Sequence, residues 1–160
     1  MHPAQDLGSH VTGSIASASV NSGAPSLVTA AGTGDATKVT GDTVDRKVSG
    51  GSALADSLVL VTAYLAALAD TKTLSFAIEL QESSDDSSWD TAEVVIAATV
   101  VATGTTGGTN ETGVNVQNIS LRSRKRYIRF NLTPDLSATA TDTALFTASA
   151  VLGGYEQLPQ

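Results

Sequence analysis

The sequence predicts an all-β protein: an antiparallel β-sandwich, jelly-roll-like, with an extended N-terminal arm. Hydrophobic residues make up 41% of the 160-residue chain, only 4% of it is aromatic, and Thr, Ser and Gly are abundant. This mixture favours strands joined by turns. Several segments in the last two-thirds alternate apolar and polar side chains, as strands do. Turn-forming residues separate them, and about six such strands pair most simply as two packed sheets.

Residues 1–35 are expected to form the arm, and residues 36–160 a single β-sandwich domain. The arm is rich in Gly, Ser, Ala and Thr, and its largest apolar side chains are Leu7, Ile15 and Leu27. So few apolar groups cannot bury a core of their own. We therefore expect the arm to become ordered only against a partner.

The domain is expected to begin with a short hairpin over 37–46, because Val39 and Val44 flank a Gly-Asp pair. The run "SLVLVTAYLAAL" that follows also fits a helical stripe. Its β-branched residues and the strand-like segment after it favour a buried strand over 58–65. Residues 66–72 then form the connecting turn.

The next segment, "TLSFAIELQES", alternates cleanly and predicts a strand with one buried face. Residues 83–90 form a polar loop in which Trp89 is expected to cap the edge of the core. A β-rich run over 92–103 is closed by the glycine-rich loop 104–113. The inward positions of the alternating segment are Leu74, Phe76, Ile78 and Leu80.

Three further strands complete the prediction. Residues 114–121 alternate, and we expect Val114, Val116 and Leu121 to lie in the core. The segment "RYIRFNL" follows and is expected to end at Pro134, which has no N–H to donate to a neighbouring strand. The last strand, 144–152, is expected to stop at Gly153-Gly154. In "RYIRFNL" the inward residues are Ile128, Phe130 and Leu132, and the outward ones are Tyr127, Arg129 and Asn131.

Charge is unevenly distributed along the chain. Nine Lys and Arg residues face sixteen Asp and Glu residues, a net charge of −7, and five of the nine cations lie in "RSRKRYIRF". The acidic balance argues against nucleic-acid binding, which needs a positive face, and Tyr127 alone offers no series of aromatic platforms for single strands. Two hypotheses remain for the cluster. It forms a patch for an acidic partner surface through Arg122, Arg124, Lys125 and Arg129, or it protects a sheet edge and pairs with carboxylates of its own chain.

No residue pattern indicates catalysis, a metal or a cofactor. The chain has no Cys, and its two histidines, His2 and His10, lie in the arm, where nothing holds them in the geometry of a general base. Asp85, Asp86 and Asp90 offer oxygen ligands for Ca²⁺, but they lack the spacing of an EF-hand loop, and a solvated turn explains them better. We therefore expect a protein that is not an enzyme.

The sequence also gives no sign of a membrane or of secretion. The longest apolar run, 58–69, is shorter than the roughly 20 residues that a membrane-spanning helix needs. The first ten residues, "MHPAQDLGSH", lack the basic and apolar regions of a secretory signal. We expect neither a signal peptide nor a transmembrane segment.

Four segments carry a resemblance to a known family. "VTGDTVDRKVSGGSA", "LADTKTLSFAIELQESSDDSSW", "RYIRFNL" and "ALFTASAVLGGYEQLP" together resemble the capsid decoration, or cement, proteins of tailed bacteriophages. The resemblance spans roughly residues 37–159 and contains no catalytic signature. It implies a small jelly-roll protein that binds the outer surface of an assembled head, often as a homotrimer, and clamps neighbouring major capsid proteins.

On this hypothesis the arm and the exposed cations contact the capsid. A flexible arm can order along several subunits, and many copies on a symmetric shell add avidity. The alternative hypothesis is a carbohydrate-binding β-sandwich module on a tail or surface appendage, which the scarcity of aromatic residues disfavours. The candidate partner-binding residues are Leu7, Ile15, Leu27, Arg46, Lys47, Arg122, Arg124, Lys125 and Arg129.

Overall fold

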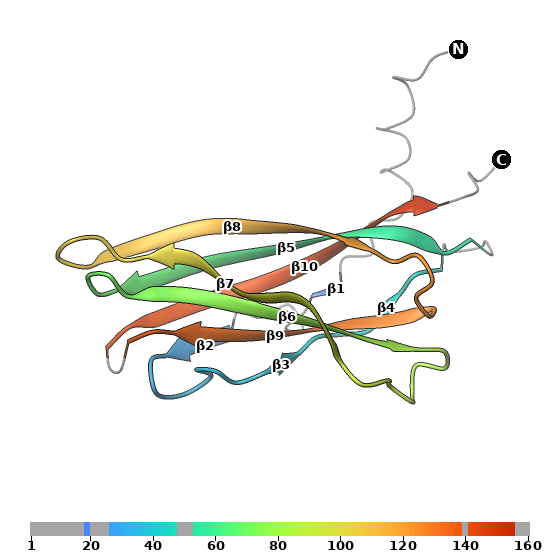
Figure 1. Ribbon diagram of the computed structural model, residues 1–160, viewed down its shortest axis with the longest axis horizontal. Helices are drawn as coiled ribbons and strands as arrows, with labels where there is room; N and C mark the ends of the chain where they lie inside the picture. The colour runs from blue at the N-terminus through green and yellow to red at the C-terminus, as the bar shows by residue number, and fades with distance from the viewer. Residues whose placement is uncertain (1–17, 20–25, 48–52, 139–140, 156–160) are drawn as a thin grey trace, which may run out of the picture.

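The computed structural model describes residues 18–19, 26–47, 53–138 and 141–155 (Figure 1). Its described elements are all strands, arranged as two antiparallel sheets that pack face to face. The predicted fold class, an all-β antiparallel sandwich, is confirmed. In this part of the chain no helix is both long enough and apolar enough to span a bilayer.

One sheet, called sheet A, has the order β1-β10-β5-β8, with β2 also paired to β10. Strands β1 and β2 therefore both lie beside the last strand, although they belong to the segment expected to be an arm. Leu7 and Ile15 lie outside the described residues. The strands are β1 (Ala18–Ser19), β2 (Ser26–Thr29), β5 (Ala55–Leu68), β8 (Thr109–Ser120) and β10 (Thr143–Tyr155).

The second sheet, called sheet B, has the order β3-β9-β6-β7, with β4 also paired to β9. The register between β6 and β7 shifts at three points, so that β7 follows an irregular path along this edge. The strands are β3 (Val39–Thr40), β4 (Val44–Asp45), β6 (Thr73–Ser83), β7 (Glu93–Thr103) and β9 (Tyr127–Leu136).

The core lies between the inner faces of the two sheets. Phe76 of sheet B and Phe146 of sheet A are fully buried, with ring centroids 5.2 Å apart in a tilted arrangement that suits two aromatic quadrupoles. The inward positions predicted for β6 and β9, and Leu121, are all buried. Strand β5 includes the predicted strand over 58–65 and extends it to Leu68.

The predicted hairpin over 37–46 is wrong. Val39 pairs with Leu132 and Val44 pairs with Ile128, so β3 and β4 lie one after the other along β9. The Gly41 N–H donates to the carbonyl of Phe130, which keeps the chain beside β9 through the Gly-Asp pair. The pair bends the chain without reversing it.

Two predicted strand ends are also wrong. Strand β9 continues through Pro134 to Leu136, because the Pro134 carbonyl accepts from the Ala36 N–H. The N–H and C=O of one residue in a strand point the same way, so the missing N–H of Pro134 faces residue 36 and removes no bond to β6. At the other end of the chain, β10 runs through Gly153-Gly154 to Tyr155, paired with the start of β5.

The core positions predicted for Val114 and Val116 are wrong as well. Both side chains point away from sheet B and are 61% and 54% exposed, while Asn115 and Gln117 take the inner side. The amide groups of this inner pair bond to each other, with 3.1 Å between Gln117 Nε2 and Asn115 Oδ1. Alternation establishes the period of a strand but leaves its inner side undetermined.

Candidate binding surfaces

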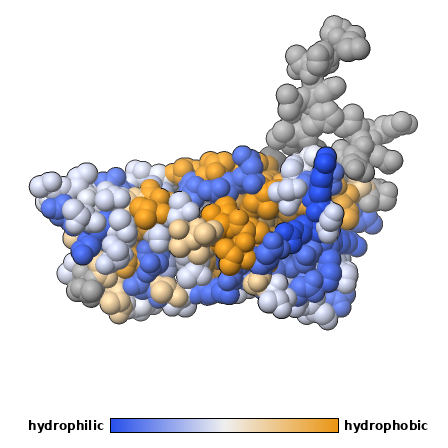
Figure 2. Space-filling view, in the orientation of Figure 1, coloured by the Kyte–Doolittle hydropathy of each residue, from blue (hydrophilic) through white to orange (hydrophobic). Residues whose placement is uncertain are grey.

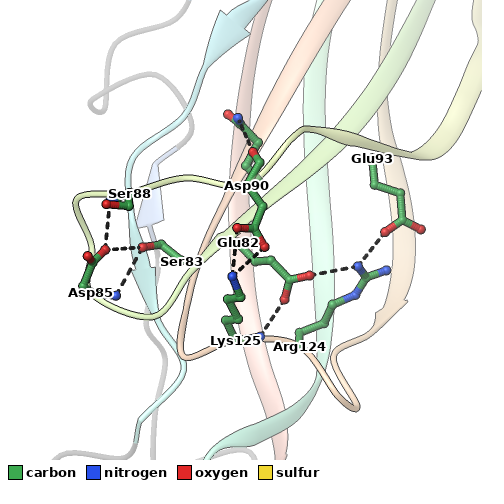
Figure 3. Close-up of polar contacts among 9 residues, drawn as sticks. Glu82, Ser83, Asp85, Ser88, Asp90, Glu93, Arg124 and Lys125 are labelled. Atoms are coloured by element: carbon green, nitrogen blue, oxygen red, sulfur yellow. Dashed lines mark hydrogen bonds and ion pairs between the residues drawn. The ribbon is translucent and has the colours of Figure 1, made fainter.

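Most cations of the basic cluster lie in the turn between β8 and β9, where carboxylates of β6, β7 and the loop between them bind Arg124 and Lys125 (Figure 3). Arg124 Nη1 lies 2.5 Å from Glu93 Oε2 and 3.3 Å from Glu82 Oε1. Lys125 Nζ lies 2.7 Å from Asp90 Oδ2, and the Lys125 backbone N–H donates to Glu82 Oε2 over 2.6 Å. Glu82 thus binds both a side chain and the backbone of the turn.

These contacts shift the pKa values of Arg124, Glu93 and Lys125 in the direction that favours charge. The hydrogen bond with Glu93 raises the pKa of Arg124, and the same contact lowers the pKa of Glu93. The hydrogen bond with Asp90 raises the pKa of Lys125. The turn is therefore fastened to sheet B by ion pairs, as the hypothesis of intramolecular pairing expects.

The two arginines at the start of β9 are also engaged within the chain. Arg126 binds Asp45 of β4 through two hydrogen bonds of 2.9 and 2.6 Å, and this contact lowers the pKa of Asp45. The Arg129 guanidinium donates to Gln81 Oε1 and stacks over the Trp89 ring, 4.2 Å from its centroid.

Arg46 is buried and is unavailable to a partner. Its side chain is 2% exposed, and burial lowers its pKa. Nε donates to the carbonyl oxygen of Ala55 over 3.0 Å, and Nη1 donates to the carbonyl oxygens of Arg124 and Lys125, the latter over 2.9 Å. This candidate residue joins β4, β5 and the turn before β9.

Two of the predicted cations remain at the surface. Lys47 and Arg122 are exposed, and neither forms an ion pair within the described ranges. Lys47 pairs with Leu54 just before β5, and Arg122 lies in the β8–β9 turn, so both lie at the end of the sandwich where that turn meets the start of β5. Arg122 borders a hollow of about 540 Å³, whose lining includes Val59, Ile119 and Gly154.

The acidic loop is organised around Asp85. Its Oδ1 accepts hydrogen bonds from the N–H groups of Ser87 and Ser88, at 3.0 and 2.8 Å, and from the Ser83 hydroxyl (Figure 3). These bonds place the pKa of Asp85 well below its ordinary value. Within the described ranges, no group of three or more His, Cys, Asp or Glu side chains is placed to hold a metal ion.

Three of the aromatic side chains that could stack on a sugar are engaged elsewhere. Trp89 is half-buried beneath Arg129, and the Arg126 guanidinium lies 4.7 Å from the ring centroid of Tyr127. The Tyr64 hydroxyl donates to the Val101 carbonyl over 2.6 Å, across the seam between the two sheets. None of these three rings is an open platform.

The sequence analysis missed the most extensive candidate surface, the outer face of sheet A. This face comprises the odd-numbered positions 57–67 of β5, the residues of β8 and β10 paired with them, and Leu27 and Thr29 of β2. None of these positions carries a charged side chain. Figure 2 shows hydrophobic surface on the middle part of the upper rim, where sheet A lies in Figure 1, and a further hydrophobic patch in the centre of the face in view. The right-hand end, near the β8–β9 turn, is hydrophilic.

One sequence signal for this surface existed. The run "SLVLVTAYLAAL" in β5 is almost continuously apolar, which is typical of a strand covered on both sides. Only one side of β5 is covered by sheet B. Leu27, a predicted partner-binding residue, lies on the other side and is 60% exposed.

No protein-family model matches the sequence, and no curated protein matches it. Similar solved structures include the VP2 subviral particle of infectious bursal disease virus, at 10% identity and a TM-score of 0.44, and the Gx strain of the same virus, at 11% and 0.45. Each alignment covers 86% of this chain and 32% of the viral chain, so this chain spans about a third of their length. The CBM22-1 xylan-binding domain of Paenibacillus barcinonensis Xyn10C aligns over 87% of this chain and 94% of its own, at 12% identity and a TM-score of 0.37. Similarities of this size do not establish a common function, and none of the inferences below rests on them.

Proposed function

We propose that this chain is a non-enzymatic virion structural protein, a decoration or cement subunit of a tailed-bacteriophage capsid. On this proposal it binds the outer surface of the assembled head and stabilises contacts between major capsid proteins. The resemblance of its segments to that family supports the proposal. Those segments correspond to β3 and β4, the β5–β6 turn with β6, and the strands β9 and β10.

The observation that carries the proposal is the separation of charge from apolar surface. The outer face of sheet A carries no charged side chain, and its Val, Leu and Ala residues alternate with Ser, Thr and Asn, whereas most ion pairs lie on sheet B and on the β8–β9 turn. An apolar area of this kind is typical of a surface that another protein covers. A chain that works by assembly needs such a surface, and a small-molecule enzyme does not.

The end of the sandwich that carries Lys47 and Arg122 is the proposed side of head contact. The Arg122 side chain borders a hollow, and its guanidinium forms no ion pair with any residue that the structure describes, so it can bind a carboxylate of the partner. Residues 1–17 precede β1, so Leu7 and Ile15 remain proposed contacts of the arm. Arg124, Lys125 and Arg129 are less suited, because their charges are already paired or stacked.

Binding to the head can be measured by co-sedimentation of the purified protein with undecorated heads of the phage that encodes it. We expect saturable binding that weakens as salt is raised, because exposed charge pairs are screened. Combined replacement of Lys47 and Arg122 by Ala should reduce binding and its dependence on salt. Deletion of residues 1–17, which leaves β1 and β2 in place, should abolish stable binding.

A matched control is the replacement of Lys72 by Ala, since Lys72 lies in the β5–β6 turn at the opposite end of β5. Its loss should leave head binding unchanged. Absence of saturable binding by the wild-type protein at both low and high salt would reject the proposal. Specific binding to a glycan that disappears on Trp89→Ala would favour the carbohydrate-binding alternative instead.

A further inference from the structure

We propose that the outer face of sheet A is a self-association surface, covered by the same face of a second copy of this chain. This inference concerns the protein in solution and does not depend on head binding. It starts from the side chains that the face presents. The large apolar ones are Leu27, Leu65, Val114, Val116 and Leu145, each more than a third exposed.

Strand β8 supplies the clearest sign that this face is covered. Its polar residues Asn115 and Gln117 lie on the inner side and bond to each other, while Val114 and Val116 point outward. If the outer side of this edge strand faced water, we would expect its valines on the inner side and its amide residues on the outer side. Covering these valines removes apolar surface from water, which is a reason to place them outward only where another surface meets them.

Charge favours a second copy as the occupant. The whole chain carries a net charge of −7, so two copies repel each other over most of their surfaces. The outer face of sheet A has no charged side chain, so two such faces can meet without like charges in contact and without burying an unpaired ion. An oppositely charged partner would find no charged side chain to pair with on this face.

The shape and size of the face also fit a symmetric contact. Flat antiparallel sheets pack face to face about 10 Å apart, with their strands about 30° from alignment. Eleven positions along β5, over a width of at most four strands (β8, β5, β10 and either β1 or β2), cover at most about 700 Å² at standard strand dimensions. A stable interface buries about 800 Å² on each partner, so the face is close to sufficient. A two-fold axis would place Val116 of one copy against the outer face of its partner.

Sedimentation-velocity analysis of the full chain, from low micromolar to submillimolar concentration, tests this inference. We expect a monomer–dimer equilibrium for the wild-type protein. Val116→Lys should weaken the dimer by at least about tenfold, because the ammonium group must lose its water on association. Val116→Thr is a second variant that keeps the β-branched shape and should weaken the dimer less.

Val100→Lys is the matched control. Val100 has the same exposed fraction as Val116, 54%, but lies on β7 at the edge of sheet B. Val100→Lys should leave the monomer–dimer equilibrium unchanged. Thermal unfolding should show that all the variants remain folded. Equal weakening by Val100→Lys would overturn the face-to-face arrangement.

Three other outcomes would also overturn the proposal. A trimer in solution would do so, because closing a three-fold ring requires two different patches on each subunit. A monomeric full chain that dimerises only after deletion of residues 1–17 would show that the chain covers the face with its own N-terminal segment. A wild-type protein that stays monomeric throughout the concentration range would reject it directly.

Discussion

Gly113 lies on β8 at the point where the side chain of Tyr64 crosses the strand. A Cβ at position 113 would lie 2.7 Å from Tyr64 Cζ and closer still to the hydroxyl oxygen. The ring cannot easily move aside, because its hydroxyl donates to the Val101 carbonyl on the facing sheet. Glycine is required at position 113 because the Tyr64 side chain passes so close to the backbone. The same side chain links the edges of the two sheets through its hydrogen bond to Val101.

Gly113→Ala should therefore lower the free energy of unfolding by about 1–3 kcal/mol, the usual range for overpacking. Urea denaturation measures the change. Gly153→Ala is the control, because a Cβ there would meet only Ser57 Oγ at 3.4 Å, an ordinary contact, and should have a much smaller effect. If Gly113→Ala were as stable as the wild-type protein, the ring would not be held in this position.

Among the larger elements, the junction of β4, β5 and the β8–β9 turn depends on Arg46. Three carbonyl oxygens of these segments, at Ala55, Arg124 and Lys125, accept from its guanidinium. An unsatisfied buried acceptor is expensive, and a buried cation with no partner is more so. The fork of the guanidinium reaches carbonyls on two different segments, which a single ammonium group cannot do as well.

Arg46→Met should lower the free energy of unfolding by about 3 kcal/mol, because all three carbonyls lose their donor. Arg46→Lys should restore only part of this loss. Lys47→Met removes a neighbouring exposed cation and should change stability by less than about 0.5 kcal/mol, as measured by urea denaturation. Equal effects at the two positions would contradict the role assigned to Arg46.

The positions of the strands could be predicted from the sequence better than which side of each strand faces the core and which strands lie beside it. Strands β6 and β9 alternate large apolar with polar residues, so both their period and their inner side were predictable. On β8 the sequence showed the alternation but not which set of residues faces sheet B. Val114 and Val116 would be core residues only if their side of the strand faced sheet B, and it faces the other way. The extent of β9 depended on which neighbour Pro134 faces, which is set by the sheet order.

The candidate site was less predictable, for a physical reason. Three cations of the stretch 122–129, Arg124, Lys125 and Arg126, pair with carboxylates that lie far away in the sequence. These carboxylates are Asp45, Glu82, Asp90 and Glu93. Nothing local distinguishes a cation that will meet such a partner from one that remains exposed. Arg122 and Arg124 are two residues apart, yet one is exposed and the other is held between two carboxylates.

For the molecule as a whole, the shifted carboxyl groups determine how stability varies with pH. The pKa values of Asp45, Asp85 and Glu93 lie below their ordinary values of 3.8, 3.8 and 4.5. The unfolded chain therefore binds protons at these groups before the folded chain does. Their contribution to stability is fully present above about pH 5 and is lost as the pH falls through the folded pKa values.

We expect the free energy of unfolding to decrease steadily between about pH 5 and pH 2. Asp85→Asn keeps an acceptor oxygen but removes the titrating group, so it should flatten this dependence. Asp135→Asn is the control, since the Asp135 carboxylate is exposed and has no hydrogen bond or ion pair within the described ranges; it should leave the slope unchanged. Urea denaturation at several pH values provides the comparison, and a steeper slope in Asp85→Asn would contradict the assignment.

The order of strands in sheet A also constrains how the chain is made. Leu27 pairs with Leu145, and β5 has β10 as one of its two neighbours. During synthesis, β2 therefore has no strand to pair with until β10 has left the ribosome. Until then β5 also lacks one of its two neighbouring strands. Pairing between such distant segments is slow, and unpaired apolar strands aggregate easily. Small and polar residues dominate the first part of the chain. They favour solubility of this segment during synthesis, while its pairing strand has not yet been made.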